Sequence, residues 1–286
     1  MARDLRVGGV PEHFNLPWRL AAGADRFVNN GVKVDWREVP AGSGELTRRL
    51  RDGELDLALV LTESAVADIL VHDRNRIVKV WVASPLVWGI HVAGGSNFDD
   101  VRDIRDRRIA ISRYGSGSHL IPVIDAAERG WDTGTMSFVV VNDLDGAREA
   151  LASGRADVFF WERHMTQPLV DAAEFRRIGE REVPWPAFVV SGRRDVLEAR
   201  GADIRKMLDI VENEARNLRR RKSAAALIAA TFGIRETDVA RWLAHVRWAS
   251  GYRCPAGGLG RAAALLEEQG LVPAVHTDPA RLWFHL

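Results

Sequence analysis

The sequence IAISRYGSGSHLIPV, residues 109–123, has the strongest local pattern for binding a charged group. An apolar strand runs into Gly115, Ser116, Gly117 and Ser118 and then into a helix, whose first backbone N–H groups have no partner within the helix. Those groups and the helix dipole attract a carboxylate, sulfonate or phosphate, and the serine hydroxyls add donors. The P-loop lysine spacing and a full GxGxxG are both missing, so we discount nucleoside triphosphate and NAD. The alternative is a tight turn that binds nothing.

Two further groups of polar residues follow buried strands, where a helix begins. Thr62, Glu63 and Ser64 form the first group, and Glu162 and His164 occupy the corresponding place later in the chain. A helix N-terminus there favours an anion by roughly 0.3 to 1 kcal/mol, so hydrogen bonds must supply most of the affinity. A carboxylate at this position either accepts hydrogen bonds from an amino or amidine group or caps its helix.

Several tryptophans stand near the ends of the predicted strands. A tryptophan offers a broad face for stacking, which suits a flat or apolar part of a ligand. The alternative for each of them is a place in the core. The candidates for the site are Trp18, Trp88 and Trp161, with Trp185 in the segment that returns to the first lobe; Trp36, Trp81, Trp242, Trp248 and Trp283 are assigned to packing.

The histidines and the single cysteine show no pattern of a metal site or of a nucleophile. His13, His91 and His119 fall near predicted strand ends, but the HxH and HExxH spacings are missing. Cys254 precedes a proline in a turn-like stretch and is assigned a structural role. The GxSxG pattern of a nucleophile elbow is also missing. We therefore expect no metal, no cofactor and no catalytic residue.

The elements that must position these residues include a stretch that occurs twice. LRDGELDLAL, residues 50–59, returns as LASGRADVFF, residues 151–160, with leucine, glycine and aspartate at the same intervals. Each copy predicts a helix closed by a left-handed glycine and followed by a buried strand, which is half of a βαβ unit. The chain is therefore predicted to contain two similar α/β lobes, with a ligand crevice at the carboxyl ends of their strands.

Helix signals divide the first lobe further. Proline at position 17 suits the first turn of a helix that ends near Gly31. Ser43 is predicted to cap the helix that ends at Gly53, and Thr62 the helix that follows the next strand.

The last third of the chain is predicted to be almost entirely helical. After Arg193 the sequence shows 3.6-residue periodicity and good helix formers. These helices need a sheet to cover, so we predict that they pack on the first lobe. Residues 1–92 and 189–286 would form this discontinuous lobe and residues 93–188 the second, with hinge crossings near Val92 and Phe188.

Composition narrows the classes of protein. The 40 basic and 39 acidic residues among 286 give a formal charge of +1, which is no footprint for nucleic acid. The longest clearly apolar stretch is too short for the ~20 residues of a membrane span, so we expect no membrane insertion. The amino terminus lacks the regions of a secretory signal. We expect a cytoplasmic protein, or a periplasmic one if the sequence is a trimmed mature form.

Four segments together give the chain a family resemblance that covers nearly its whole length. They are GELDLALVLTES, SNFDDVRDIRDRRIAISRYGSGSHL, ALASGRADVFFWERH and ETDVARWLAHVRW. In these segments and their order the chain resembles the type II periplasmic-binding-protein fold. Within that fold it is similar to the nitrate/sulfonate/taurine-type ABC substrate-binding proteins, in the superfamily that includes the thiamine-pyrimidine synthases.

The resemblance implies a two-lobed receptor that closes by a hinge on a small anionic or zwitterionic organic solute. In transport systems such a receptor presents the solute to an ABC permease, and we expect it to be a monomer. The loops that would face the ligand are residues 9–14, 62–64, 113–119 and 161–164. The candidate binding residues are His13, Trp18, Thr62, Glu63, Ser64, Trp88, Arg113, Tyr114, Ser116, Gly117, Ser118, His119, Trp161, Glu162 and His164.

An enzyme on the same fold is the alternative. The pyrimidine synthases that the chain resembles need a lysine for pyridoxal phosphate, whereas lysine here occurs only at positions 33, 79, 206 and 222, none in a predicted strand-end loop. Related decarboxylases and desulfinases rely on cysteine or histidine, and Cys254 is badly placed for that role. The sequence therefore favours binding over catalysis and leaves the ligand open.

Overall fold

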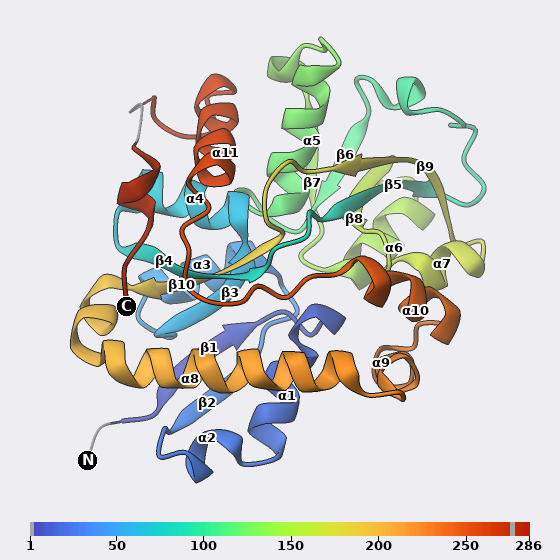
Figure 1. Ribbon diagram of the computed structural model, residues 1–286. Coiled ribbons are helices and arrows are strands. Elements are labelled where there is room, and N and C mark those ends of the chain that lie inside the picture. The colour runs from blue at the N-terminus through green and yellow to red at the C-terminus, as the bar shows by residue number, and fades with distance from the viewer. Residues whose placement is uncertain (1–2, 275–277) are drawn as a thin grey trace.

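The computed structural model describes residues 3–274 and 278–286, which form two mixed α/β lobes, each with a five-stranded sheet (Figure 1). The first sheet contains β1 (Leu5–Gly9), β2 (Val34–Glu38), β3 (Leu57–Leu61), β4 (Asn75–Val82) and β10 (Phe188–Arg193), in the order β2-β1-β3-β10-β4. The second contains β5 (Val87–Ala93), β6 (Arg108–Ile111), β7 (Ser137–Val140), β8 (Val158–Glu162) and β9 (Phe175–Glu182), in the order β7-β6-β8-β5-β9. The predicted two-lobed α/β fold is confirmed.

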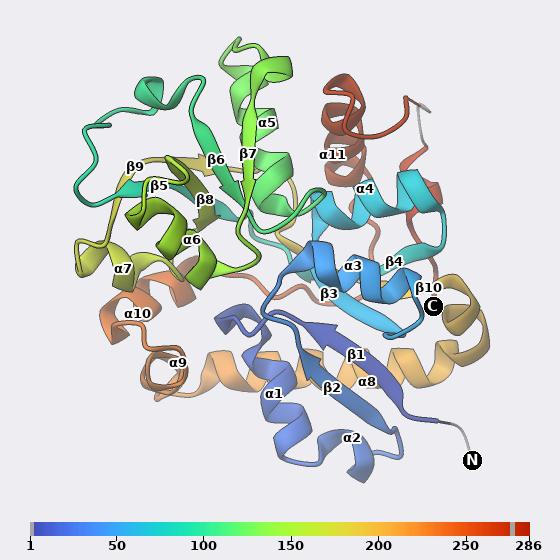
Figure 2. The same cartoon turned by 180° about the vertical axis from the view of Figure 1, so that it is seen from behind.

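Helices cover both sheets and fill the last third of the described chain. The first lobe has α1 (Leu16–Gly23), α2 (Arg26–Asn29), α3 (Ser43–Arg51) and α4 (Thr62–His72), and the second has α5 (Gly117–Glu128), α6 (Leu144–Ala152) and α7 (Gln167–Asp171). The remaining helices are α8 (Arg194–Arg220), α9 (Ala224–Phe232), α10 (Glu236–His245) and α11 (Ala256–Glu268). Figures 1 and 2 show α8 on one face of the first sheet and α3 and α4 on the other.

The sequence repeat corresponds to a structural repeat. Gly53 and Gly154 follow α3 and α6 with φ of +72° and +68°, the left-handed conformation that ends each helix. The aspartate before each buried strand, Asp56 or Asp157, is then held by an arginine at the start of the neighbouring parallel strand. Arg6 Nη2 lies 2.8 Å from Asp56 Oδ1, and Arg108 Nη2 lies 2.9 Å from Asp157 Oδ1. The same local interaction thus fixes the register of β1 with β3 and of β6 with β8.

The chain passes between the sheets twice, at residues 83–86 and 183–187. The first crossing comes earlier than the predicted position near Val92, because Val92 lies inside β5, which pairs with β8 and β9 of the second sheet. Buried strands of either sheet have the same apolar pattern, so the sequence carries no signal for the sheet that this strand joins. The second crossing ends at Phe188, where β10 of the first sheet begins.

Three predicted helix boundaries differ from the structure. The helix predicted to run to Gly31 breaks into α1 and α2 at Asp25, whose φ is +52°. Ser43 and Thr62 are the first helical residues and not N-caps. The Ser43 hydroxyl accepts a hydrogen bond from the Leu61 backbone N–H at 2.9 Å, and the Thr62 hydroxyl donates to the Pro186 carbonyl. Both hydroxyls therefore join separate segments of the chain instead of capping the N-termini of their own helices.

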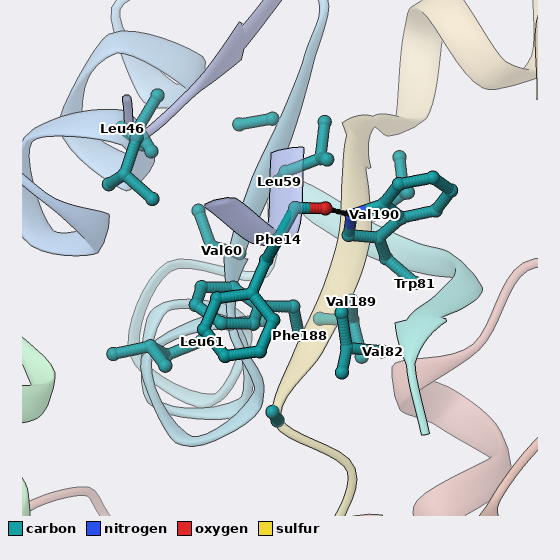
Figure 3. Close-up of a cluster of buried hydrophobic side chains, with 14 of the residues drawn as sticks. Phe14, Leu46, Leu59, Val60, Leu61, Trp81, Val82, Phe188, Val189 and Val190 are labelled. Carbon is teal, nitrogen blue, oxygen red and sulfur yellow. Dashed lines mark hydrogen bonds between the residues drawn. The ribbon is translucent and has the colours of Figure 1, made fainter. Parts of the chain in front are cut away.

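A buried cluster in the first lobe holds the loop after β1 in place (Figure 3). Phe14 is 4% exposed, and its ring lies 5.0 Å from the ring of Phe188. Trp81 Nε1 donates to the Phe14 carbonyl at 3.2 Å and to Asn15 Oδ1 at 3.1 Å. Burial of a phenylalanine side chain contributes roughly 1.5 to 3 kcal/mol, so this loop is fixed by packing and by hydrogen bonds together.

The C-terminal helices pack on the first lobe and also reach the second. α8 contacts α1 and β10, and α11 contacts α4, as Figure 1 shows. Arg235 stands just before α10, and its Nε lies 3.0 Å from Oδ2 of Asp171 in α7. Helix α11 also contacts α5 of the second lobe. Within the described residues, no helix has both the length and the apolar character of a membrane span.

Candidate functional site

A narrow cavity of about 30 Å³ lies between the lobes, where segments of both sheets meet. Its walls come from the loop after β1, the start of α3, the ends of β3 and β8, the start of β10, β5 and the loop before α5. The lining residues are Val10, Glu12, Gly42, Ser43, Leu61, Leu86, Trp88, Ser112, Ser116, Gly117, Ser118, Trp161, Glu162 and Phe188. A water needs roughly 10 to 15 Å³ of such space, so the cavity holds about two waters.

Three serines of the second lobe form a hydrogen-bonded group on one wall. Ser118 Oγ accepts from the Ser112 backbone N–H at 2.9 Å and lies 3.0 Å from Ser116 Oγ and 3.2 Å from Ser112 Oγ. Ser116 Oγ donates to the Arg113 carbonyl at 2.7 Å, so its proton is already used. Ser112, Ser118 and the N–H groups at the start of α5 remain as donors that can turn toward a ligand.

Two carboxyl groups line the same cavity, one from each lobe. Glu12 belongs to the loop after β1, and Glu162 is the last residue of β8. Burial and the nearby charge of Glu162 raise the pKa of Glu12 to about 8. Burial raises the pKa of Glu162 to about 7, although its carboxylate accepts a hydrogen bond from the Met165 backbone N–H at 2.7 Å. Both carboxyl groups therefore hold a proton more tightly than a free glutamate does.

Aromatic rings and a close approach of the backbone narrow the cavity. Trp88 is 3% exposed, and no described residue accepts a hydrogen bond from its Nε1. A Cβ at Gly117 would lie 2.6 Å from Trp88 Cη2 and 2.4 Å from Leu61 Cδ1 of the other lobe. Trp161 stacks on Phe159, with ring centroids 5.0 Å apart. Only a glycine at position 117 allows the two walls to approach this closely.

The structural repeat relates several wall residues of the first lobe to wall residues of the second. Val7 of β1 and Ile109 of β6 are equivalent, because each pairs with the first residue of the neighbouring strand β3 or β8. Val10 and Ser112 each come three residues after these positions. Leu61 and Glu162 end the equivalent strands β3 and β8. Leu61 pairs with Phe188, and Glu162 pairs with Trp88. In each equivalent pair the first lobe supplies an aliphatic or phenyl side chain and the second supplies a hydroxyl, a carboxyl or an indole.

The structure places six of the fifteen predicted binding residues on the cavity wall. These six are Trp88, Ser116, Gly117, Ser118, Trp161 and Glu162. Arg113 is instead paired with Glu45 of the first lobe, with Nη1 and Oε2 2.9 Å apart. Hydrogen bonding from Arg48, together with this pair, lowers the pKa of Glu45 to about 2. Arg113 thus joins the two lobes beside the cavity.

Of the predicted group at the start of α4, Thr62 and Glu63 contact the second crossing, and none of the three residues lines the cavity. Glu63 Oε2 accepts a hydrogen bond from Trp185 Nε1 at 2.9 Å, and burial raises the pKa of Glu63 to about 7. Thr62 is bonded to Pro186, as described above. The Ser64 hydroxyl is buried and has no hydrogen-bond partner in the described part of the chain. Thr62 and Glu63 therefore fasten the crossing to α4.

The other predicted residues lie in the core, on the surface or in neighbouring hollows. Trp18 is fully buried and stacks on Trp36, with centroids 5.4 Å apart. Tyr114 is 63% exposed and packs edge-on against His119. The alternative assignment of Trp18 to the core therefore matches its position, and neither Tyr114 nor His119 lines the cavity.

The rings of the predicted histidines His13 and His164 lie 6.2 Å apart, and neither residue lines the cavity. His13 Nδ1 lies 3.3 Å from Met165 Sδ, and burial lowers the pKa of His13 well below its usual value. Burial also lowers the pKa of His164 to about 4, so both rings are neutral at pH 7. In residues 3–274 and 278–286, no group of three or more His, Cys, Asp or Glu side chains is placed to hold a metal ion.

Eight lining residues are not among the fifteen candidates, and Glu12 and Ser112 are two of them that carry polar side chains. Glu12 and Val10 lie in the loop of residues 9–14, which is predicted to face the ligand, but His13 is the only candidate from that loop. Ser112 directly follows β6, so its place at a strand end is the signal that the sequence offers. The others are Gly42, Ser43, Leu61, Leu86 and Phe188.

Comparisons with known structures identify the class of fold. The chain matches the Candida albicans CA3427 gene product, described as defining a new family with the generic periplasmic binding protein fold, at 24% identity and a TM-score of 0.88, covering 98% of this chain and 95% of that one. It matches the alkanesulfonate-binding protein SsuA from Xanthomonas axonopodis pv. citri, solved bound to MOPS, at 21% identity and a TM-score of 0.82, covering 100% of both chains. It also matches the periplasmic aliphatic sulphonate binding protein SsuA from Escherichia coli at 20% identity and a TM-score of 0.72, covering 98% and 97%.

The chain therefore has the type II periplasmic-binding-protein fold, as the sequence resemblance implied. Within that class, residues 88–181 match the family of Ca3427-like periplasmic binding proteins. A comparison with curated proteins gives no match.

Proposed function

We propose that this protein binds a small organic solute in the cavity between its lobes and opens and closes around it at the two crossings. The observation that carries the proposal is the cavity itself, whose wall combines the serine group and the start of α5 with side chains of the facing lobe. A cavity of about 30 Å³ is too small for an organic solute. Binding therefore requires the lobes to separate, as two crossings with few residues permit.

The comparisons support a role in solute transport. Two of the structures with this fold carry names of sulfonate-binding proteins, and one of them was solved with a sulfonate bound. We infer that the protein is the solute-binding partner of an ABC permease and binds a solute with an acidic group at the start of α5. Delivery to such a permease takes place outside the cytoplasmic membrane, so cell fractionation separates this role from that of a cytosolic binding protein.

The binding proposal is tested by replacing one hydroxyl of the serine group. We expect sulfonates or carboxylates to raise the thermal midpoint of the wild type and to be recovered chemically unchanged. Ser118→Ala should weaken their binding by about 1 to 3 kcal/mol, because a donor is lost in a desolvated site. Ser137→Ala is the matched control, since Ser137 is an exposed residue at the start of β7 in the same lobe.

Two outcomes of this experiment would contradict the proposal. Equal affinity of wild type and Ser118→Ala for a bound solute would place the site elsewhere. Chemical turnover of the solute would replace the binding role with an enzymatic one.

A further inference from the structure

Trp88 carries a buried hydrogen-bond donor that no other described part of the chain uses. The residue is 3% exposed and lines the cavity between the lobes. No described residue accepts a hydrogen bond from its Nε1. A buried donor without an acceptor is costly, and most such donors in native proteins have a partner. The indole N–H of Trp88 therefore indicates an acceptor that does not belong to the described chain.

Polar side chains that line the same cavity have partners of their own. Trp88 of β5 pairs with Glu162 of β8, so the two side chains leave the same face of the sheet. The Glu162 carboxylate nevertheless accepts from the Met165 backbone N–H, at 2.7 Å. Ser118 Oγ accepts from the Ser112 backbone N–H at 2.9 Å and lies 3.2 Å from Ser112 Oγ. The carboxylate and the serine group are thus engaged without the indole.

The edge of the indole that bears this N–H lies at the start of α5. A Cβ at Gly117 would lie 2.6 Å from Trp88 Cη2 and 2.8 Å from Trp88 Cζ2. Cζ2 and Nε1 are bonded to the same ring carbon, Cε2, so the N–H stands at this edge of the ring. Gly117 is the first residue of α5. The indole donor and the start of the helix therefore lie side by side.

The first two backbone N–H groups of α5 are also without acceptors. His119 N and Leu120 N both donate to the Ser116 carbonyl at 2.9 Å, which closes the first turn. The N–H groups of Gly117 and Ser118 donate to no residue that the structure describes, as is usual for the first residues of a helix. Both residues are buried and line the cavity. Together with the indole, they place three free N–H donors at one wall.

We propose that the Trp88 indole N–H donates a hydrogen bond to an acidic oxygen of the bound solute, beside the N–H groups of Gly117 and Ser118. The proposal rests on the function proposed above and assigns Trp88 a role in selecting the solute. An indole or backbone N–H can only donate, whereas a serine hydroxyl can also accept. A solute group that presents an oxygen to this wall satisfies these donors, and one that presents a hydrogen leaves them unpaired.

Closure of the lobes makes this hydrogen bond count. A Cβ at Gly117 would also lie 2.4 Å from Leu61 Cδ1, so the first lobe covers the same place when the lobes are together. When the lobes separate, Leu61 moves away and water can hydrate the donors. When they close on a solute, the oxygens of its acidic group replace that water. Hydrogen bonds to a charged acceptor are roughly twice as strong as neutral ones, so the closed state favours the anion.

The experiment follows the indole proton itself. The chain contains ten tryptophans, and the indole signal that is missing from the proton–nitrogen spectrum of Trp88→Phe belongs to Trp88. The probes are 1-propanesulfonate, butyrate and the neutral 1-propanesulfonamide. Titration calorimetry at pH 7 compares the wild type with a protein in which 3-benzothienylalanine replaces Trp88. This side chain keeps the shape of the indole and has sulfur in place of the N–H.

The matched control carries 3-benzothienylalanine in place of Trp131. Trp131 belongs to the same lobe and does not line the cavity. The control therefore contains the same chemical change at a tryptophan outside the site. Its affinity for each probe should equal that of the wild type.

We expect the Trp88 indole proton to move downfield on saturation with 1-propanesulfonate or butyrate, because a hydrogen bond deshields it. The replacement of Trp88 by 3-benzothienylalanine should weaken the binding of these anions by roughly tenfold to a hundredfold. The preference for the sulfonate over the sulfonamide should fall by roughly threefold or more, because the lost bond is stronger to the anion. A role in packing alone would change neither the indole proton nor this preference.

An indole proton of Trp88 that does not move at saturation with either anion would overturn the proposal. Equal affinity of the wild type and the protein with 3-benzothienylalanine at position 88 would also overturn it. Either result, with anions still bound by the wild type, leaves the binding function standing and removes only the role of Trp88. If neither anion binds to the wild type, the result counts against the binding function and the role of Trp88 together.

Discussion

Replacement of Gly117 by alanine tests whether the lobes move as proposed. A Cβ at this position would lie 2.4 Å from Leu61 Cδ1 of the first lobe and 2.6 Å from Trp88 Cη2. Gly117 is the first residue of α5 and its φ is not in the left-handed region, so alanine meets no backbone strain there. Alanine is also the better helix former. Any effect of Gly117→Ala must therefore come from packing.

The expected magnitude follows from the cost of one extra carbon in a packed contact. Overpacking of this kind costs about 1 to 3 kcal/mol. The contact with Leu61 exists only while the lobes are together, so separation of the lobes relieves that part of the strain. A shift of about 1 to 3 kcal/mol changes the ratio of closed to open molecules by roughly 5- to 150-fold. Solute affinity should fall by a similar factor.

Distances between labelled cysteines measure the effect directly. Val28 in α2 and Val140 in β7 are exposed and lie on different lobes, and Cys254 is the only native cysteine of the chain. In a C254S background, spin labels at V28C and V140C report the separation of the lobes by double electron–electron resonance. Gly117→Ala should change this distance distribution, with a larger share of the population at the separation of the open form.

The control is Gly95→Ala, because a Cβ at Gly95 meets nothing within 4 Å. It should leave the distance distribution unchanged. Identical distributions for the wild type and Gly117→Ala would refute the reasoning, since they would show that the contact does not limit closure. An equal shift in Gly95→Ala would trace the effect to a general loss of order.

Two further predictions concern buried ionisable groups. Burial raises the pKa of Glu63 to about 7, above its usual value near 4.5, so the native state binds this proton more tightly than the unfolded state does. The stability that the protonated Glu63 contributes is present at low pH and falls by about 3 kcal/mol as pH rises from about 4 to 8. In urea unfolding, the Glu63→Gln variant should lack this loss. A difference in unfolding free energy between the wild type and Glu63→Gln that stays the same at every pH would contradict the prediction. Lys79 Nζ lies 2.7 Å from Glu212 Oε2 and 2.6 Å from the Gly251 carbonyl, with the Lys79 side chain fully buried. Lys79→Met should lower the free energy of unfolding by up to about 3 to 5 kcal/mol, because the Glu212 carboxylate loses its buried cation and keeps only the Gly251 backbone N–H at 3.1 Å and the half-exposed Arg216 Nη1 at 3.5 Å. Adding Glu212→Leu should recover most of this loss, and a double variant as unstable as the single one would disprove this account.

The sequence predicts those features that depend on residues close together in the chain. Gly53 and Gly154 end their helices as expected, because a left-handed glycine is a local requirement. The role of Thr62 depends on Pro186, which lies 124 residues away, and no local pattern shows that partner. In the same way, Glu12 is one polar residue of a loop until Phe14 and its neighbours fix that loop against the sheet.

The repeat also explains why the composition of the cavity is harder to predict than its position. Equivalent strands bring equivalent positions of the two lobes to the same cavity, so the duplicated pattern is enough to place these positions beside one another. The side chains at those positions have diverged: Leu61 corresponds to Glu162, and Phe188 corresponds to Trp88. The first lobe thus supplies shape at these positions, while hydrogen bonding and charge come from the second. Glu12, which falls outside these pairs, adds a carboxyl group of the first lobe to the lining of the same cavity.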